Sequence, residues 1–128
     1  MKKIAMLFNL NRHQYEYETE FDSKLTIDSI YNVLSKKYEV KKIEADKGFK
    51  WIDELNQYHP DLVFNICEGY NGPARESVYG AILEQFNYNY SGPDSTNLLL
   101  FHQVLIFHLF WLVQSCLMPF GLSCFLLD

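Results

Sequence analysis

The feature that most constrains this chain is the abrupt loss of charge close to position 98. All eleven Lys and Arg residues, and fifteen of the sixteen acidic residues, come before that position. From Leu98 to Leu127 the chain has no formally charged side chain. Charged side chains are mostly exposed in folded proteins. The first part therefore has the side chains that a water-exposed surface needs, and the second part lacks them. The sequence therefore predicts an α/β domain over 1–97, followed by an apolar tail over 98–128.

The size and charge of the chain exclude several classes of protein. A chain of 128 residues is one domain by the usual length relation. Its net charge of −5 argues against a nucleic-acid partner or a polybasic membrane patch. Cys67, Cys116 and Cys124 have neither metal-site spacing nor a disulfide framework. An odd number of thiols fits a reducing compartment, so we expect a cytoplasmic protein.

Short apolar runs alternate with segments that have helical spacing. We expect strands over 4–10, 38–43 and 62–67, helices over 26–38, 49–58 and 76–86, and a long loop over Asn11–Lys24. This alternation predicts a small parallel sheet with flanking helices, an α/β fold of the Rossmann-like kind. Ligands of such sheets gather beyond the carboxyl ends of the strands, which here means the loops 9–24, 68–75 and 91–94.

Three finer expectations follow from the same pattern. The nearly continuous apolar strand 62–67 is typical of a strand covered on both faces. In the third helix, Val78, Ile82 and Phe86 form one apolar stripe, which predicts its buried face. Residues 88–90 could add a short strand before the turn at Ser91–Asp94.

The residues best suited to binding a ligand lie at and after the end of the third expected strand. Glu68 places a carboxylate at the strand tip, and Gly69 lets the backbone turn away. Arg75 and Glu76 follow at a helix start, where the helix end itself favours an anion. Carboxylates for an ammonium group and an arginine for a carboxylate suit a zwitterion such as an amino acid. Glu68, Gly69, Arg75 and Glu76 are therefore candidate substrate-binding residues; the plainer alternative is a solvated loop acid before an ordinary helix-start pair.

The run from position 60 to 92 resembles the amino-terminal domain of D-alanine–D-alanine ligases and their ATP-grasp relatives. The matching segments are Asp61-Leu62-Val63-Phe64-Asn65-Ile66-Cys67-Glu68-Gly69, Ala74-Arg75-Glu76 and Tyr90-Ser91-Gly92. The resemblance covers roughly positions 1 to 100. Orthodox members more often have His-Gly at the strand tip, so Glu68 points to the D-alanine–D-alanine ligase-like branch. The resemblance also implies a substrate-binding glutamate in the first loop, and Glu16, Glu18 and Glu20 remain alternatives.

The resemblance implies a parent enzyme that activates a carboxylate with ATP as an acyl phosphate and joins it to an amine. ATP and Mg²⁺ would serve that full-length parent, which forms homodimers in the family. Where the family has an Asp-Lys pair that contacts nucleotide phosphates, this sequence has Gln103-Val104. We therefore expect this chain to hold an amino acid or small carboxylate substrate, without a cofactor, metal or catalytic residue of its own.

The tail permits three interpretations. We favour an aberrant or out-of-frame end that replaces the family's sequence. A membrane or interface segment is the second, because residues 98–117 are long and apolar enough to span a bilayer, although no Lys or Arg flanks them. An ordinary buried helix is the third. Besides the ligase hypothesis, two alternatives stay open: a non-catalytic flavodoxin- or receiver-like binding module, and a tail-anchored membrane protein.

Overall fold

The computed structural model describes residues 1–72 and 74–95, and the predicted tail from 98 onward lies outside the described residues. Its elements follow in the order β1 (Lys3–Phe8), the 3-10 helix η1 (Glu16–Glu20), α1 (Lys24–Leu34), β2 (Glu39–Glu44), α2 (Lys50–Tyr58), β3 (Leu62–Ile66) and α3 (Arg75–Gln85). A small parallel sheet flanked by helices is the α/β fold that the alternating pattern predicts.

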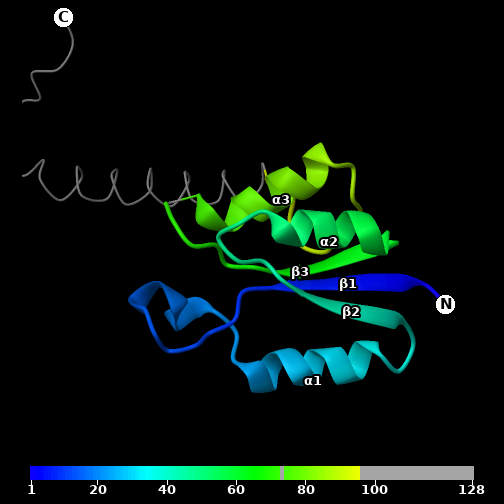
Figure 1. Ribbon diagram of the computed structural model, residues 1–128, viewed down its shortest axis with the longest axis horizontal. Helices are drawn as coiled ribbons and strands as arrows, with labels where there is room; N and C mark the ends of the chain where they lie inside the picture. The colour runs from blue at the N-terminus through cyan, green and yellow to red at the C-terminus, as the bar shows by residue number, and fades with distance from the viewer. Residues whose placement is uncertain (73, 96–128) are drawn as a thin grey trace, which may run out of the picture.

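The sheet has the strand order β2-β1-β3, and both neighbours of β1 run parallel to it. Met6 in the middle of β1 pairs with Lys42 on one side and Phe64 on the other. The chain thus leaves β1 toward β2 and then crosses back to β3. Because crossover connections share one hand, opposite directions of travel place α1 and α2 on opposite faces. Figure 1 shows this arrangement, with α1 on one face and α2 and α3 on the other.

Side chains of β1 alternate between two buried clusters. Ala5 and Leu7 point toward α2 and α3, where they join Trp51, Leu55 and Leu83. Met6 and Phe8 point the other way, where Ile27 of α1 covers them. A central strand with apolar partners on both faces explains why every side chain of β1 from Ile4 to Phe8 is apolar.

Local signals set the ends of two helices. Ser23 caps α1, since its hydroxyl oxygen accepts a hydrogen bond from the Thr26 N–H at 3.2 Å. At the other end of α2, His59 adopts a left-handed conformation with φ 51°. Pro60 follows, and a residue before proline avoids the helical region, so the predicted end at His59-Pro60 is confirmed.

The prediction for the buried face of α3 was wrong. Val78 and Phe86 are 47% and 49% exposed, whereas the buried positions are Ser77, Tyr79, Gly80 and Leu83. The reason is close packing by a small residue. A Cβ at position 80 would lie 3.3 Å from the Tyr90 hydroxyl, so glycine lets the following segment approach the helix. A periodicity count that recognises only large apolar residues misses such a face.

Three further expectations are corrected. The first loop contains η1 rather than being irregular throughout. Strand β3 buries Val63 fully on the α2 side, but Phe64 and Ile66 are only partly buried on the other side, where they pack against the cluster that contains Ile27 of α1. The expected strand near position 90 reduces to one bridge, in which the Ser91 N–H donates to the Val63 carbonyl at 2.9 Å.

Within the described part of the chain, we find no helix with the length and hydropathy needed to cross a bilayer.

Candidate active-site edge

Asn9, immediately after β1, organises the carboxyl edge of the sheet. Its side chain is 1% exposed, and its carbonyl oxygen accepts hydrogen bonds from the N–H groups of Glu68 (2.8 Å) and Gly69 (3.0 Å). Its amide nitrogen donates to the Ala45 carbonyl at 2.6 Å and to the Tyr79 hydroxyl at 3.2 Å. One side chain therefore ties together the ends of β1, β2 and β3 and the buried face of α3.

The carboxyl edge of the sheet contains the position where the connections of two neighbouring strands lead in opposite directions. The connections after β1 and β3 lead away in opposite directions, because β1 continues toward β2 and β3 continues toward the bridge at Tyr90. Ligands of open α/β sheets bind outside the carboxyl ends of the strands at such a reversal. The predicted loops 9–24 and 68–75 meet at this point.

Gly69 brings the loop after β3 against the start of α3. Its φ of +79° favours glycine, and a Cβ there would lie 2.4 Å from the Arg75 carbonyl oxygen. No other residue fits without a shift of the backbone. The close approach holds Glu68 near the first turn of α3, where Arg75 and Glu76 stand.

Arg75, the first residue of α3, forms an ion pair with Glu20 at the end of η1. The contact joins the first loop to the third, although the two residues are far apart in sequence. Of the three first-loop acids that the sequence leaves open, Glu20 is the one at this edge. Glu18 instead is buried and accepts the N–H groups of Arg12 and Gln14, each at 3.0 Å. Glu18 thus has a structural role, which is to hold the backbone of the first loop.

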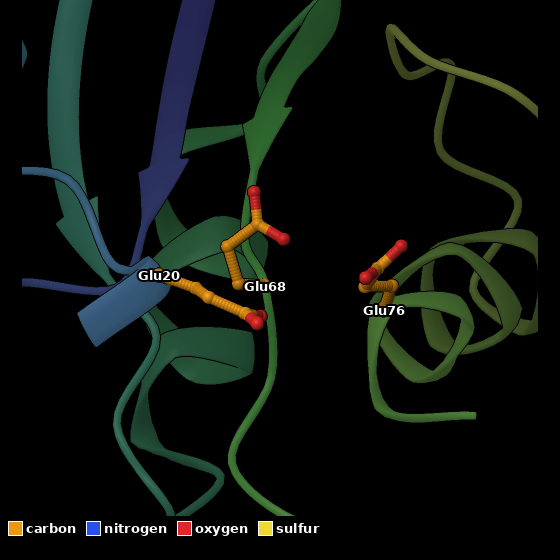
Figure 2. Close-up of side chains that lie close together, drawn as sticks. All are labelled: Glu20, Glu68 and Glu76. Carbon is orange, nitrogen blue, oxygen red and sulfur yellow. The ribbon is translucent and has the colours of Figure 1, made fainter. Parts of the chain in front are cut away.

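Three carboxylates meet at the edge. Glu20, Glu68 and Glu76 each place one oxygen so that the three atoms lie within 4.8 Å of one another. Figure 2 shows the three side chains, which come from η1, the loop after β3 and the start of α3. With Arg75 as the neighbouring cation, three negative charges and one positive charge leave a formal charge of −2. Such a group of oxygens could receive an ammonium group or a hard divalent cation.

The surroundings of Glu68 raise the pKa of its carboxyl. Partial burial raises the pKa of this carboxyl, and the negative charges of Glu76 and Asp22 raise it further. A cation bound between the carboxylates would offset both causes.

Aromatic side chains fix the first loop over this edge. The Tyr70 ring, just after Gly69, lies edge-on to Phe21 and Tyr17, with centroid distances of 5.0 Å and 5.6 Å. The Lys47 ammonium lies 4.4 Å from the Tyr17 ring centroid, in reach of a cation–π interaction. The tyrosine-rich loop is thus an ordered wall of the edge.

Asn65 in β3 and Cys67 just after the strand have structural roles. The Asn65 side-chain oxygen accepts the Cys67 N–H at 3.2 Å, as expected for a polar residue in an apolar strand. Cys67 is buried and forms no disulfide, and burial raises the pKa of its thiol well above the usual value. Neither side chain offers chemistry at the edge.

The structure thus brings Glu68, Gly69, Arg75 and Glu76 together, and it adds Asn9, Glu20 and Tyr79. Sequence reasoning missed Asn9 as the organiser, although a polar residue directly after a buried apolar strand is a usable signal. Tyr79 had no such signal, because its role depends on the packing of α3.

Comparison with known proteins adds no relative: no family model matches the sequence, and no curated protein or solved structure matches it either.

Proposed function

We propose that this chain binds an amino acid as the substrate-side domain of an ATP-dependent carboxylate–amine ligase of the D-alanine–D-alanine ligase-like kind. One observation carries the proposal: carboxylates and an arginine from three separate segments converge at the carboxyl edge of a parallel sheet. Glu68 and Glu76 would receive the substrate ammonium. Arg75 and the amino end of α3 would face its carboxylate.

The charge balance supports a zwitterion over a simple anion or cation. A net formal charge of −2 repels a free carboxylate unless an ammonium group accompanies it. A simple amine would leave Arg75 without a new partner. The Glu20–Arg75 ion pair also has to open, or to share its guanidinium, when a substrate carboxylate binds. The guanidinium can do so because it has five N–H donors.

ATP and Mg²⁺ have no assigned place in the described residues. No glycine-rich phosphate loop follows any of the three strands there. In this proposal the nucleotide and its metal bind to other parts of the ligase, and the described residues only hold and orient one substrate.

The binding claim is tested by titrating the isotopically labelled full-length chain with alanine and following the amide resonances. We expect shifts at Glu68, Gly69 and the start of α3. Propionate lacks the ammonium group and ethylamine lacks the carboxylate, so both should produce much smaller shifts. Glu68→Gln should weaken alanine binding, whereas Glu39→Gln, at the opposite end of the sheet, should not. Shifts that do not require both charges would contradict the proposal.

The ligase claim has its own test, which is to sequence the gene through codons 91–128 and further downstream. A reading frame that restores an Asp-Lys pair near codon 103 and continues into ATP-grasp motifs would support the ligase. If no frame does so, the ligase part of the proposal fails, and amino-acid binding has to be explained without it.

A further inference from the structure

A cavity of about 200 Å³ adjoins the carboxylate edge on the α2–α3 side of the sheet. Gly69 and Arg75 belong to both, since they line the cavity and also shape the edge. The apolar part of the lining comes from Phe49, Trp51, Tyr70, Val78, Tyr79 and Ile82. Its polar side chains are Asp46, Lys47, Asn71 and Arg75. A substrate held at the edge therefore has an aromatic-walled space beside it.

The cavity is lined by both buried and exposed apolar side chains. Trp51 and Tyr79 are 2% and 5% exposed, and their ring centroids lie 5.6 Å apart. Phe49, just before α2, and Val78 of α3 remain 69% and 47% exposed at the same cavity. Large apolar side chains left in water around one hollow gain stabilisation when an apolar group covers them.

The apolar stripe of α3 that the sequence predicted to be buried also indicates that an apolar group can bind in this cavity. Val78 and Ile82 lie one helical turn apart and do form an apolar stripe, as the sequence indicates. Both residues line the cavity, and only Ile82 also packs against the core. The apolar residues that follow helical spacing in α3 therefore line a surface that a ligand can cover.

We infer that the substrate is an amino acid with a large apolar, aromatic side chain, whose ring occupies this cavity while its ammonium group meets the carboxylates. The inference rests on the proposed function, because it places the charged end of the substrate at Glu68 and Glu76. The size is suitable: an apolar cavity of roughly 150 Å³ holds one benzene ring. The cavity thus has room for a phenyl ring and the methylene that links it to the charged end.

Trp51 makes the cavity observable. The chain has two tryptophans, Trp51 and Trp111, so Trp111→Phe leaves Trp51 as the only one. Full-length protein with this change is titrated with phenylalanine and with alanine, each in both enantiomers, by calorimetry and by Trp51 fluorescence. We expect one enantiomer of phenylalanine to bind at least about tenfold more tightly than alanine, from burial of the ring. Only phenylalanine should change the Trp51 emission.

Two valines provide the matched variants. Val78→Ala removes part of the rim and should weaken phenylalanine binding about threefold or more, with no effect on alanine. Val33→Ala changes a helical valine on α1 that is more exposed than Val78 (64% against 47%) and lies outside the cavity lining, so it should affect neither ligand. Both positions are exposed, so neither substitution should unfold the chain.

The outcomes separate this inference from the function on which it rests. Equal affinities for alanine and phenylalanine would overturn the inference and leave the amino-acid site intact. No binding of any amino acid would overturn both. If phenylalanine binds tightly but Glu68→Gln leaves its affinity unchanged, the ring and the carboxylates do not belong to one site, and the inference also fails.

Discussion

At the scale of single residues, Asn9 shows why an amide is required after β1. The position has two acceptor-bearing groups on one side, the Ala45 carbonyl and the Tyr79 hydroxyl, and two N–H groups on the other, at Glu68 and Gly69. Only an amide offers two donors and an acceptor in one small side chain. Aspartate would supply acceptors alone and would bring a buried charge.

Replacing this amide should destabilise the fold. Asn9→Ala leaves the Glu68 and Gly69 N–H groups without their partner, so we expect the free energy of unfolding to fall by about 2–4 kcal/mol. Urea denaturation followed by circular dichroism measures it. Asn32→Ala, on the exposed side of α1, is the control and should change stability by less than about 0.5 kcal/mol. Equal effects of the two substitutions would contradict the role of Asn9.

Glu68 should make stability depend on pH in an unusual direction. Its pKa is raised in the folded state, so the neutral carboxyl is favoured there. Below the unfolded-state pKa of about 4.3, both states hold the proton and the contribution is complete. As pH rises through the folded-state pKa, the carboxylate forms in a place that disfavours it and stability is lost.

Glu68→Gln should therefore raise the free energy of unfolding at neutral pH, and this gain should fade as the pH approaches 4. Urea unfolding of both proteins across this range measures the difference. Glu76→Gln should lower the pKa of Glu68 in a carboxyl NMR titration, because it removes a neighbouring negative charge. Glu39→Gln at the far end of the sheet serves as the control. A gain that is independent of pH would rule out this explanation.

At the scale of elements, the loop between β3 and α3 is defined by two glycines with different surroundings. Gly69 and Gly72 both have positive φ, at 79° and 86°. A Cβ at Gly69 would collide with the Arg75 backbone, whereas one at Gly72 would meet nothing within 4 Å. Gly69 is required because a Cβ there would collide with Arg75. Gly72 is favoured only because its φ is positive.

This contrast yields a paired prediction. Gly72→Ala should cost about 1 kcal/mol, the usual penalty of a left-handed conformation for a residue with a Cβ. Gly69→Ala should cost about 2–4 kcal/mol, because the overpacking against α3 adds to that penalty. Thermal and urea denaturation of the two variants give the values. Similar losses at both positions would mean that the loop does not press on α3.

The sequence was informative for elements whose signals are local. The strand at 62–66 and the end of α2 at Pro60 could be predicted, because apolar runs and proline act through the backbone itself. The buried face of α3 could not, since Gly80 is buried for close approach and not for hydrophobicity. For the candidate site, the strand tip revealed Glu68 and Gly69. The choice of Glu20 among three loop acids depends on how η1 folds back, which no local signal encodes.

At the scale of the whole molecule, β1 is the element on which the rest depends. It is the central strand, and its two parallel neighbours leave β2 as an edge within the described residues. Both side-chain clusters include residues of β1. Parallel strands covered on both faces are usually the most protected part of such a fold.

Hydrogen exchange should follow this order. We expect the amides of β1 to exchange at least about tenfold more slowly than those of β2 that point away from the sheet, because they open only when the whole domain unfolds. Amide exchange followed by NMR at neutral pH gives the rates residue by residue. Uniform rates across the three strands would be inconsistent with the order β2-β1-β3.

The hydrogen bonds of Asn9 bear on how readily the binding specificity of this protein can change. Of the four groups that Asn9 contacts, three are backbone atoms, at Ala45, Glu68 and Gly69. These hydrogen bonds therefore do not depend on which side chain stands at position 68, proline excepted. A library of substitutions there can vary the ligand chemistry while the scaffold stays folded, which makes position 68 a natural starting point for evolving new binding specificities.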